Sequence, residues 1–261
     1  MNKLGFIGMG NMAQALAVSF IRSGKIKPEN VFAYAPHQDK LRRNAELIGF
    51  TPVSSVTALA DAADTIVFAC KPYQIESVLQ ELGTHLDHKA VVSVALGWDY
   101  EKFTAAVSES VRIQYVMPNT PAMVGEGVML FEDQNSFEEK ERNELLDLFS
   151  VCGTVQEMPS RLMGIAGTIT GCGPAFVDMI IEAYADAGVK YGLQRTDAYK
   201  LVSQMILGSA KLQRDTGTHP AVLKDNVCSP NGATIRGVAS LEESGLRSAC
   251  IRSIDEIMNR K

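Results

Sequence analysis

Near its N-terminus the chain reads Leu4-Gly5-Phe6-Ile7-Gly8-Met9-Gly10-Asn11-Met12-Ala13, a short apolar run followed by the pattern Gly-x-Gly-x-x-Ala. The apolar run predicts a β-strand, and residues 12–23, closed by Gly24, predict a helix. In such a strand–turn–helix, the first glycine allows a tight turn and the second lets the backbone approach a pyrophosphate. The small third residue lets the helix pack closely on the sheet. A helix N-terminus also offers free N–H groups to phosphates. We therefore expect a dinucleotide here; the alternative is a glycine turn with a structural role alone.

The remainder of the first half alternates apolar runs with amphipathic segments. Strands are predicted at residues 31–34, 65–69, 90–93, 113–116, 127–131 and 154–158, and helices at residues 39–48 and 137–149. Strands that alternate with helices at this spacing indicate a parallel, doubly wound sheet, the Rossmann architecture. We therefore expect a dinucleotide-binding Rossmann domain over residues 1–160.

The strand pattern stops near residue 160. A helix is predicted over residues 174–191, with Pro174 in its first turn, and a second helix runs from an N-cap at Thr196 to about residue 213. Helical patterns resume after Thr234 and over residues 246–259. The fold class predicted is α/β followed by all-α, with an all-α domain over residues 161–261.

Composition narrows the classes of function and location. The chain has 261 residues, a net charge of −5 and no block of Lys or Arg, which argues against a nucleic-acid partner. Its five cysteines are scattered without a Cys-x-x-Cys pair and are expected to be reduced thiols. Glycines interrupt the N-terminal apolar stretch, and no apolar run reaches the roughly 18 residues of a membrane span. We expect a cytoplasmic protein that is not inserted in a membrane.

The end of the second predicted strand bears on the choice of dinucleotide. NAD-binding sites usually carry an acid there for the ribose 2′-hydroxyl. This chain instead has Tyr34-Ala35-Pro36-His37, and its first acid is Asp39. The end of this strand therefore lacks a carboxylate that would repel the 2′-phosphate of NADP. Basic residues follow it: His37, Lys40, Arg42 and Arg43. NADP(H) is the predicted cofactor, with NAD as the alternative.

Several further motifs occur in a fixed order. They are Ala69-Cys70-Lys71-Pro72, Met117-Pro118-Asn119-Thr120-Pro121, Thr170-Gly171-Cys172-Gly173-Pro174-Ala175, His219 to Val227, and Ser229-Pro230-Asn231-Gly232-Ala233-Thr234. Together with the N-terminal motif, they make the chain resemble the pyrroline-5-carboxylate reductases over essentially its whole length. The resemblance implies NAD(P)H-dependent reduction of L-1-pyrroline-5-carboxylate to L-proline, the last step of proline biosynthesis. It also implies a homodimer with interlocked helical domains, or a larger ring such as a decamer.

The resemblance also implies which residues contact each ligand. Cofactor contacts would be Gly8, Met9, Gly10, Asn11, Met12, Tyr34, Pro36, Ala69, Cys70, Lys71, Pro72, Ala95, Leu96 and Asn226. Asn119 is a further candidate near the nicotinamide. The alternative is that its Pro-Asn-Thr-Pro segment shapes a turn and has no ligand contact, with or without a cis bond. Lys71 is open to a similar alternative, a turn lysine with no chemical task. Substrate contacts would be Asn231, Gly232, Ala233 and Thr234.

Three positions depart from the family pattern. Residues 54–56 read Ser-Ser-Val where an asparagine is common at the end of the third strand. Asn231-Gly232 replaces a usual Gly-Gly, and Gly217 stands where some members carry an acid. The first leaves the cofactor preference open, and the other two can alter substrate affinity without removing an indispensable group.

The 229–234 loop has suitable chemistry for a small cyclic imine with a carboxylate. The loop precedes a predicted helix, so the N–H groups of Gly232, Ala233 and Thr234 are expected to hold the carboxylate. The Thr234 hydroxyl is the predicted catalytic group, as a hydrogen-bond donor to the ring nitrogen. The alternative reading of Thr234 is a plain N-cap. No metal is predicted, because His85, Asp87 and His88 resemble metal ligands in composition only.

Two other functions remain to be weighed. The start Gly-Phe-Ile-Gly-x-Gly-x-Met is shared with β-hydroxyacid dehydrogenases, which rely on a lysine in the helical domain. Lysines are available there (Lys190, Lys200, Lys211 and Lys224), but none has the expected context. The second alternative is a non-catalytic dinucleotide-binding regulator, which a complete set of candidate site residues argues against.

Overall fold

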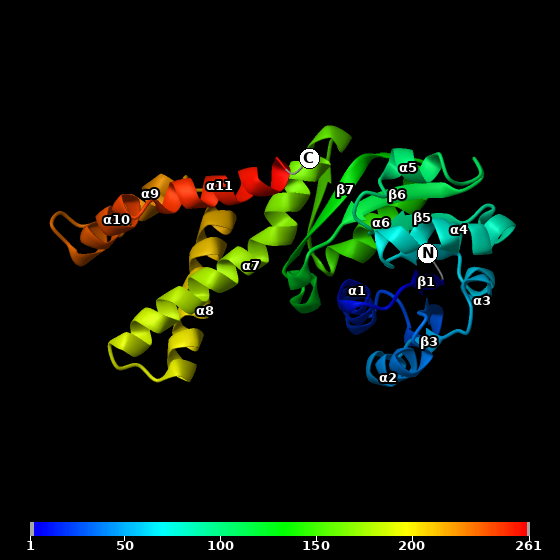
Figure 1. Ribbon diagram of the computed structural model, residues 1–261, viewed down its shortest axis with the longest axis horizontal. Coiled ribbons are helices and arrows are strands. Elements are labelled where there is room, and N and C mark those ends of the chain that lie inside the picture. Colours follow the sequence, from blue (N-terminus) through cyan, green and yellow to red (C-terminus); the bar gives the residue numbers. More distant parts are fainter. Residues whose placement is uncertain (1–2, 260–261) are drawn as a thin grey trace. The chain divides into compact units, whose positions relative to one another are not determined.

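The computed structural model describes residues 3–259 (Figure 1). The chain divides into two compact units, unit 1 (Met1–Gly171) and unit 2 (Cys172–Lys261). The expected boundary at residue 160 coincides with the start of helix α7 (Ser160–Lys190), and the compact units divide eleven residues later in the same helix. We describe the two units separately.

Unit 1 contains one sheet, which has eight strands within residues 3–259. The strands are β1 (Leu4–Ile7), β2 (Val31–Tyr34), β3 (Thr51–Pro52), β4 (Thr65–Phe68), β5 (Ala90–Ser93), β6 (Arg112–Met117), β7 (Gly127–Asn135) and β8 (Gly153–Met158), in the order β3-β2-β1-β4-β5-β6-β7-β8. The pairs among β1 to β6 are parallel, so the predicted doubly wound sheet is confirmed. After β1 the chain forms β2 and β3 on one side of β1, and it then crosses over to form β4 on the other side. This change of direction makes a topological switch point at the carboxyl end of β1.

The end of the sheet that contains β7 and β8 departs from the predicted all-parallel arrangement. β7 runs antiparallel to β6, while β8 is parallel to β7. The connection from β6 to β7 is a short 3₁₀ segment, η4 (Thr120–Val124). A parallel pair needs a crossover of about a dozen residues or more, which this connection does not provide.

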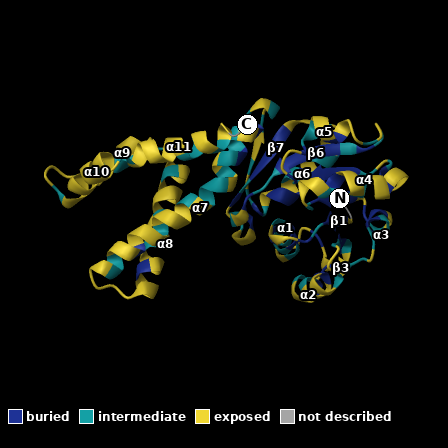
Figure 2. Cartoon of the chain, in the orientation of Figure 1, coloured by how far each residue is buried: buried dark blue, intermediate teal, exposed yellow. Residues whose placement is uncertain are grey.

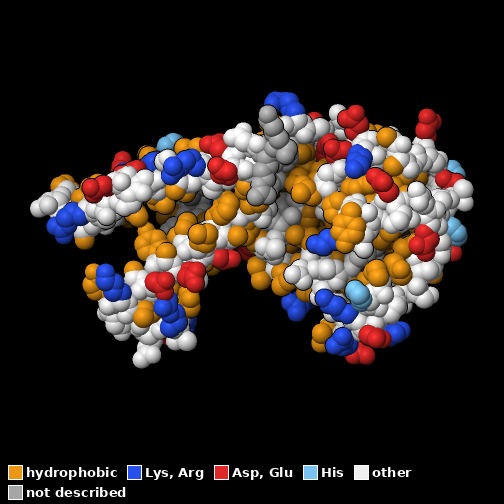
Figure 3. Space-filling view, viewed as in Figure 1, with side chains coloured by type: hydrophobic (Ala, Val, Ile, Leu, Met, Phe, Trp, Pro, Cys, Tyr) orange, Lys and Arg blue, Asp and Glu red, His pale blue; other side chains and the backbone are white. Residues whose placement is uncertain are grey.

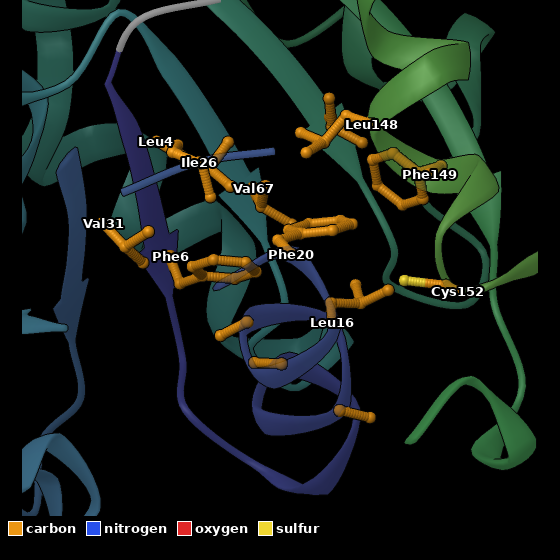
Figure 4. Packing of buried hydrophobic residues seen from close by; sticks show 14 of the residues in the cluster. Leu4, Phe6, Leu16, Phe20, Ile26, Val31, Val67, Leu148, Phe149 and Cys152 are labelled. Atoms are coloured by element: carbon orange, nitrogen blue, oxygen red, sulfur yellow. The ribbon is translucent and has the colours of Figure 1, made fainter. Parts of the chain in front are cut away.

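Helices cover both faces of the sheet in unit 1. One buried cluster joins the sheet to α1 (Asn11–Arg22), α2 (Gln38–Ile48) and α6 (Glu139–Ser150). A second joins it to α3 (Val56–Ala62), α4 (Ile75–Leu82) and α5 (Tyr100–Thr104). A third, smaller cluster joins β6 and β7 to the start of α7. Figure 4 shows Leu16 and Phe20 of α1 beside Phe6 of β1 in the first cluster. The rings of Phe20 and Phe149 meet edge to face with centroids 5.1 Å apart.

Unit 2 is helical, as predicted. Helix α7 continues into it and is followed by α8 (Arg195–Thr216), α9 (Pro220–Asn226), α10 (Ala233–Glu243) and α11 (Leu246–Met258). Two predicted boundaries are wrong. Pro174 lies inside α7 and not in a first turn. Gln194 is the N-cap of α8, so Thr196 already lies in the helix.

Unit 2 buries little of its apolar surface within one chain (Figure 2). Among its described residues, the buried hydrophobic side chains are Ala185 and Ala198. Figure 3 shows hydrophobic side chains on the surface of its helices. Exposed apolar residues include Met179, Tyr184, Tyr199, Leu201, Met205, Leu207, Leu212, Leu241 and Ile251. Helix α7 is long and apolar enough to cross a membrane by length and composition, with 6% of its most apolar window buried.

Candidate functional site

The turn after β1 is fixed by Gly8. Its φ of +94° lies in the region that favours glycine, and a Cβ there would stand 2.7 Å from the backbone nitrogen of Cys70. The Gly8 N–H donates to the Tyr34 carbonyl at 2.8 Å. Gly8 therefore lets the ends of β1, β2 and β4 meet at the switch point.

Gly10 has a different task. Its backbone is extended, and a Cβ built on it would have no heavy atom within 4 Å. Gly10 is the N-cap of α1 without a side-chain cap, and the first turn of α1 carries no acidic residue. Because the first N–H groups of a helix have no partner within the helix, Asn11 and Met12 present donors to this open space. The residues present thus fit a bound pyrophosphate.

Two nearby side chains complete the phosphate loop. Ala13 is fully buried against the sheet, as the motif predicts. The Gln14 Nε2 donates to the Met9 carbonyl at 3.0 Å, and this bond fixes the orientation of the peptide group between Met9 and Gly10. The sequence analysis did not identify Gln14, although an amide side chain one turn into the helix was a visible signal.

The end of β2 carries no carboxylate in the cofactor position. Tyr34 is half-buried and Pro36 is exposed, and Gln38 Nε2 holds the loop by donating to the carbonyls of Ala35 (2.9 Å) and Val53 (3.2 Å). The first acid, Asp39, forms a 3.1 Å ion pair with Arg42.

The side chains of His37 and Lys40 are exposed beside that loop. From the sequence, both are candidate basic partners of a 2′-phosphate. Arg43 is turned back along its own helix, where its Nε donates to the Asp39 carbonyl at 3.4 Å.

The Ser54-Ser55-Val56 departure has a structural explanation. Strand β3 has only two residues, and Ser55 already serves as the N-cap of α3. Its hydroxyl accepts from the Ala58 N–H at 3.0 Å. Ser55 is therefore engaged in starting a helix.

The residues after β4 form the next predicted contact. The Ala69 N–H donates to the Ile7 carbonyl at 2.9 Å, which continues the pairing of β4 with β1. Burial raises the pKa of the Cys70 thiol to about 11, so the thiol is neutral at physiological pH. Lys71 is exposed and its backbone N–H donates to Gln74 Oε1 at 3.1 Å.

The residues after β5 form a turn with an exposed tip. Ala95 is buried, Leu96 is 70% exposed, and Gly97 has a φ of +73°. Trp98 follows and is buried; its Nε1 donates to the carbonyl of Pro72 at 3.1 Å. Sequence reasoning missed Trp98, although it is the single tryptophan of the chain and adjoins a predicted contact.

Asn119 has a structural role that its sequence context only partly indicated. Its Oδ1 accepts from the Val128 N–H at 2.8 Å, and its Nδ2 donates to the Thr170 carbonyl at 2.9 Å. The Thr170 carbonyl would ordinarily accept from residue 174, but Pro174 has no N–H. Asn119 thus supplies the hydrogen bond that Pro174 cannot, and allows α7 to pass through a proline. Residues 117–121 contain no cis bond.

The 229–234 loop opens α10, as predicted, but two details differ. Gly232 is the N-cap, so Thr234 is the second residue of the helix and not its N-cap. The Gly232 N–H donates to the Ser229 carbonyl at 3.0 Å and is not free for a carboxylate. Gly232 has no side-chain cap to offer, and the first turn of α10 has no acid, which leaves the N–H groups of Ala233 and Thr234 for an anion. Both residues are exposed.

The two departures in unit 2 follow from backbone geometry. Asn231 has a φ of +57°, a conformation that glycine favours and that asparagine tolerates better than most residues. Asn231 therefore preserves the turn that Gly-Gly would make. Gly217 is the C-cap of α8 with a φ of +62°, a position where glycine is favoured.

The remaining predicted residue of unit 2, Asn226, is the last residue of α9. His219 is the N-cap of that helix, and its Nδ1 accepts from the Ala221 N–H at 3.2 Å. The structure therefore gathers Asn226 and the 229–234 loop at the ends of α9 and α10 in unit 2.

The histidines near residue 85 lie outside this arrangement. His85 Nδ1 is 2.8 Å from Asp61 Oδ1, and the His88 backbone N–H donates to the Ser110 hydroxyl at 3.2 Å. Over residues 3–259, no group of three or more His, Cys, Asp or Glu side chains is arranged to hold a metal ion.

Unit 1 brings its predicted cofactor residues to one edge of the sheet. The segments after β1, β2, β4 and β5 all leave carboxyl ends of neighbouring parallel strands. In open α/β sheets ligands bind at this edge, beside the switch point.

Comparisons with known proteins agree with this arrangement. Residues 3–97 match the family "NADP oxidoreductase coenzyme F420-dependent", and residues 160–261 match "Pyrroline-5-carboxylate reductase dimerisation". The pyrroline-5-carboxylate reductase of Treponema pallidum is 40% identical over 96% of this chain and 97% of its own. That of Escherichia coli is 36% identical over 99% and 96%. The crystal structure of Plasmodium falciparum pyrroline carboxylate reductase with NADP bound superposes with a TM-score of 0.89 at 35% identity, covering 98% of this chain and 95% of that one. The chain belongs to the pyrroline-5-carboxylate reductase family.

Proposed function

We propose that this protein reduces L-1-pyrroline-5-carboxylate to L-proline with NADPH, the last step of proline biosynthesis, in the cytoplasm. The observation that carries the proposal is similarity to enzymes of that name over nearly the whole chain, at up to 40% identity among those compared. NADP is the cofactor in the related Plasmodium falciparum structure, which supports the same choice here.

The cofactor supplies the hydride when it is bound. The uncapped N-terminus of α1 would hold its pyrophosphate through the N–H groups of Asn11 and Met12, with Gly10 leaving room for close approach. Tyr34 and Pro36 would flank the adenosine half, because they follow β2. The further contacts we propose are Gly8, Met9, Ala69, Cys70, Lys71, Pro72, Ala95, Leu96, Asn119 and Asn226. For Asn119 this contact would add to its hydrogen bonds within the protein.

The N-terminus of α10 would hold the substrate. The N–H groups of Ala233 and Thr234 would hold its carboxylate, while Asn231 and Gly232 shape the preceding turn. The Thr234 hydroxyl would donate to the ring nitrogen and so stabilise the charge that develops there as the C=N bond is reduced. Because the N–H of Gly232 is already engaged, two backbone donors rather than three serve the carboxylate.

A second copy of the chain would cover the apolar faces of unit 2. A helical unit that buries Ala185 and Ala198 but exposes Leu201, Met205 and Leu207 needs another surface to be stable in water. The match of residues 160–261 to a dimerisation family supports a homodimer. We propose that dimers assemble further, as in a decamer, and that α7 is covered by protein rather than by lipid.

We further propose that the 229–234 loop of one chain serves the cofactor bound to its partner. The test combines Gly10→Val, which blocks the phosphate loop, with Thr234→Ala on a second chain. Each homodimer should be weak. If sites are shared between chains, the heterodimer contains one intact site and activity reappears; if each site lies within one chain, mixing restores nothing.

The proposed reaction is tested by following the loss of NADPH and NADH absorbance with purified protein. Absorbance should fall only when pyrroline-5-carboxylate is present, with proline as the product. A parallel assay with 3-hydroxyacids and NADP⁺ tests the β-hydroxyacid dehydrogenase alternative. Binding of NADPH without turnover of either substrate would favour a regulator.

A further inference from the structure

One side chain connects the turn after β4 with the turn after β5. The Trp98 Nε1 donates to the carbonyl of Pro72 at 3.1 Å, although the two residues are 26 positions apart. Strands β4 and β5 pair in parallel, with Phe68 opposite Ser93, so both turns leave the same edge of the sheet. The indole therefore bridges two segments that are proposed to contact the cofactor.

The indole is itself held firmly. Trp98 is 3% exposed, and its ring meets Phe103 edge to face with centroids 5.2 Å apart. The Nζ of Lys102 lies 4.3 Å from the centroid of the indole ring. Because the ring has little freedom, the direction of its N–H is set before any ligand binds.

The turn after β5 has one further anchor. The Trp98 backbone N–H donates to the Ala95 carbonyl at 3.1 Å. This bond closes the backbone from Ala95 to Trp98 around the exposed Leu96 tip.

The position of the two turns indicates which half of the cofactor they face. In a dinucleotide-binding sheet, β1 to β3 and β4 to β6 form two mononucleotide-binding halves on either side of the switch point. The phosphate loop and the end of β2 lie in the first half, with the adenosine. The turns after β4 and β5 belong to the second half, with the nicotinamide.

We propose that Trp98 is a positioning residue for the nicotinamide half of the cofactor, and that its hydrogen bond to Pro72 holds the turns after β4 and β5 as one preformed wall. This inference rests on the proposed function, because it assumes that a nicotinamide dinucleotide binds at this edge. Ordering loops on binding weakens affinity, so a wall ordered in advance strengthens it.

The test is Trp98→Phe, which removes the N–H donor but keeps an aromatic ring beside Phe103. Dissociation constants are measured by calorimetry for NADPH and for 2′-phospho-ADP-ribose, which has the adenosine and pyrophosphate but no nicotinamide. One hydrogen bond corresponds to about a 3- to 10-fold change in affinity. The Kd and KM for NADPH should rise about 3- to 10-fold, while the Kd of the fragment should change less than about 2-fold. The kcat should change less than the KM for NADPH does.

Phe149→Leu is the matched control. It removes a fully buried aromatic ring from the first cluster of unit 1 and leaves Trp98, Phe103 and the Pro72 carbonyl unchanged. We expect this variant to lose at least as much thermal stability as Trp98→Phe and to bind NADPH with a Kd within about 2-fold of wild type.

The outcomes separate this inference from the proposed function. Equal weakening of NADPH and the fragment, or weakening by Phe149→Leu in proportion to its loss of stability, would overturn the positioning role. So would unchanged NADPH affinity in Trp98→Phe beside a wild type that binds and turns over normally. A wild type that fails to bind NADPH would overturn the proposed function and this inference together.

Discussion

Units 1 and 2 bury their apolar residues in different ways. The two largest clusters of unit 1 sandwich its sheet, with aromatic residues such as Phe6, Phe20 and Phe103 fully buried. Unit 2 buries Ala185 and Ala198, and leaves most of its large apolar side chains exposed. The same chain therefore contains a unit that completes its own core and a unit whose surface needs another chain. The proposed homodimer would make α7 part of an interface between protein chains.

The largest effect is expected from a charge on the apolar surface of unit 2. Leu201→Glu, on α8, should prevent association, because a buried charge without a partner costs about 3–5 kcal/mol. We expect dissociation to monomers and a loss of activity of about 100-fold or more. Sedimentation and steady-state kinetics measure both.

The matched control is Leu47→Glu, on α2 of unit 1, where the wild-type side chain is 84% exposed. It should change neither assembly nor activity. If Leu201→Glu also remained an active oligomer, the contrast between the two units would not reflect association through α8.

The next effect separates two glycines of the same loop. Gly10→Val keeps an extended backbone and meets no neighbour, so it should fold normally. Its side chain would fill the space proposed for the pyrophosphate, and we expect NADPH affinity to fall about 100-fold or more. Gly8→Ala should instead lower the thermal stability of unit 1, because its φ is +94° and its Cβ would overlap the Cys70 backbone. Calorimetric melting and NADPH titration of both variants check this difference; two equally unstable proteins would contradict it.

The Thr234 hydroxyl of unit 2 is expected to affect the chemical step rather than assembly. Thr234→Ala should keep the dimer and NADPH binding but lower kcat/KM for pyrroline-5-carboxylate by about 10- to 1,000-fold, as expected when one positioned donor is removed. Thr234→Ser retains the hydroxyl and should recover most of the rate. If the alanine variant matched wild type, the role of Thr234 would be limited to the first turn of α10.

Much of unit 1 could be predicted from its sequence because local patterns decide it. Apolar runs identified β1, β2, β4 and β5, and the glycine pattern located the phosphate loop. The short elements β3, α3, α4 and α5 were missed, since two to eight residues carry too little periodicity. The antiparallel turn into β7 depends on the length of a connection and not on the strands themselves.

What could not be predicted depends on contacts that are distant in sequence. In the sequence, Pro174 indicates the start of a helix. In the structure the helix continues through Pro174, because the side-chain amide of Asn119, 55 positions earlier, donates the hydrogen bond that proline cannot. The bridge from Trp98 to Pro72 is of the same kind. In unit 2 the 229–234 loop was located correctly, but the engaged N–H of Gly232 became visible only in the folded turn.

A smaller effect is expected for the choice of cofactor, which lies wholly in unit 1. NADPH should give the better kcat/KM in wild type. Ala35→Asp introduces a carboxylate at the end of β2, which repels a 2′-phosphate and can accept from a 2′-hydroxyl. The ratio of kcat/KM for NADPH to that for NADH should fall by about 10-fold, whereas the neutral Ala35→Asn should change it less. A wild type that prefers NADH would refute the argument from the missing acid.

The smallest effect is expected for a buried carboxylate in unit 1, and it tests whether the surrounding hydrogen bonds offset the cost of burying its charge. Glu132 of β7 is 4% exposed, and burial raises the pKa of its carboxyl, with Asp99 and Asp133 acting in the same direction. The neighbouring Ser160 side chain and the Tyr100 N–H, which donates to Glu132 Oε2 at 2.9 Å, partly oppose that rise.

The raised pKa fixes the sign of a pH effect. The folded state holds the Glu132 proton more tightly than the unfolded state, so this group favours folding below its ordinary pKa. That contribution is lost as the pH rises through the raised value, and at neutral pH the charged form is a net penalty. Glu132→Gln keeps an oxygen that can accept from the Tyr100 N–H but has no charge. We expect its Tm to exceed that of wild type at pH 7 by no more than about 2–4 °C, and the difference to vanish as the pH approaches the ordinary pKa of glutamate. Thermal melts over this pH range, with surface Glu46→Gln as the control, measure the effect. A glutamine variant less stable than wild type at pH 7 would contradict this prediction. It would mean that the hydrogen bonds inside unit 1 fully offset the cost of burying the Glu132 charge.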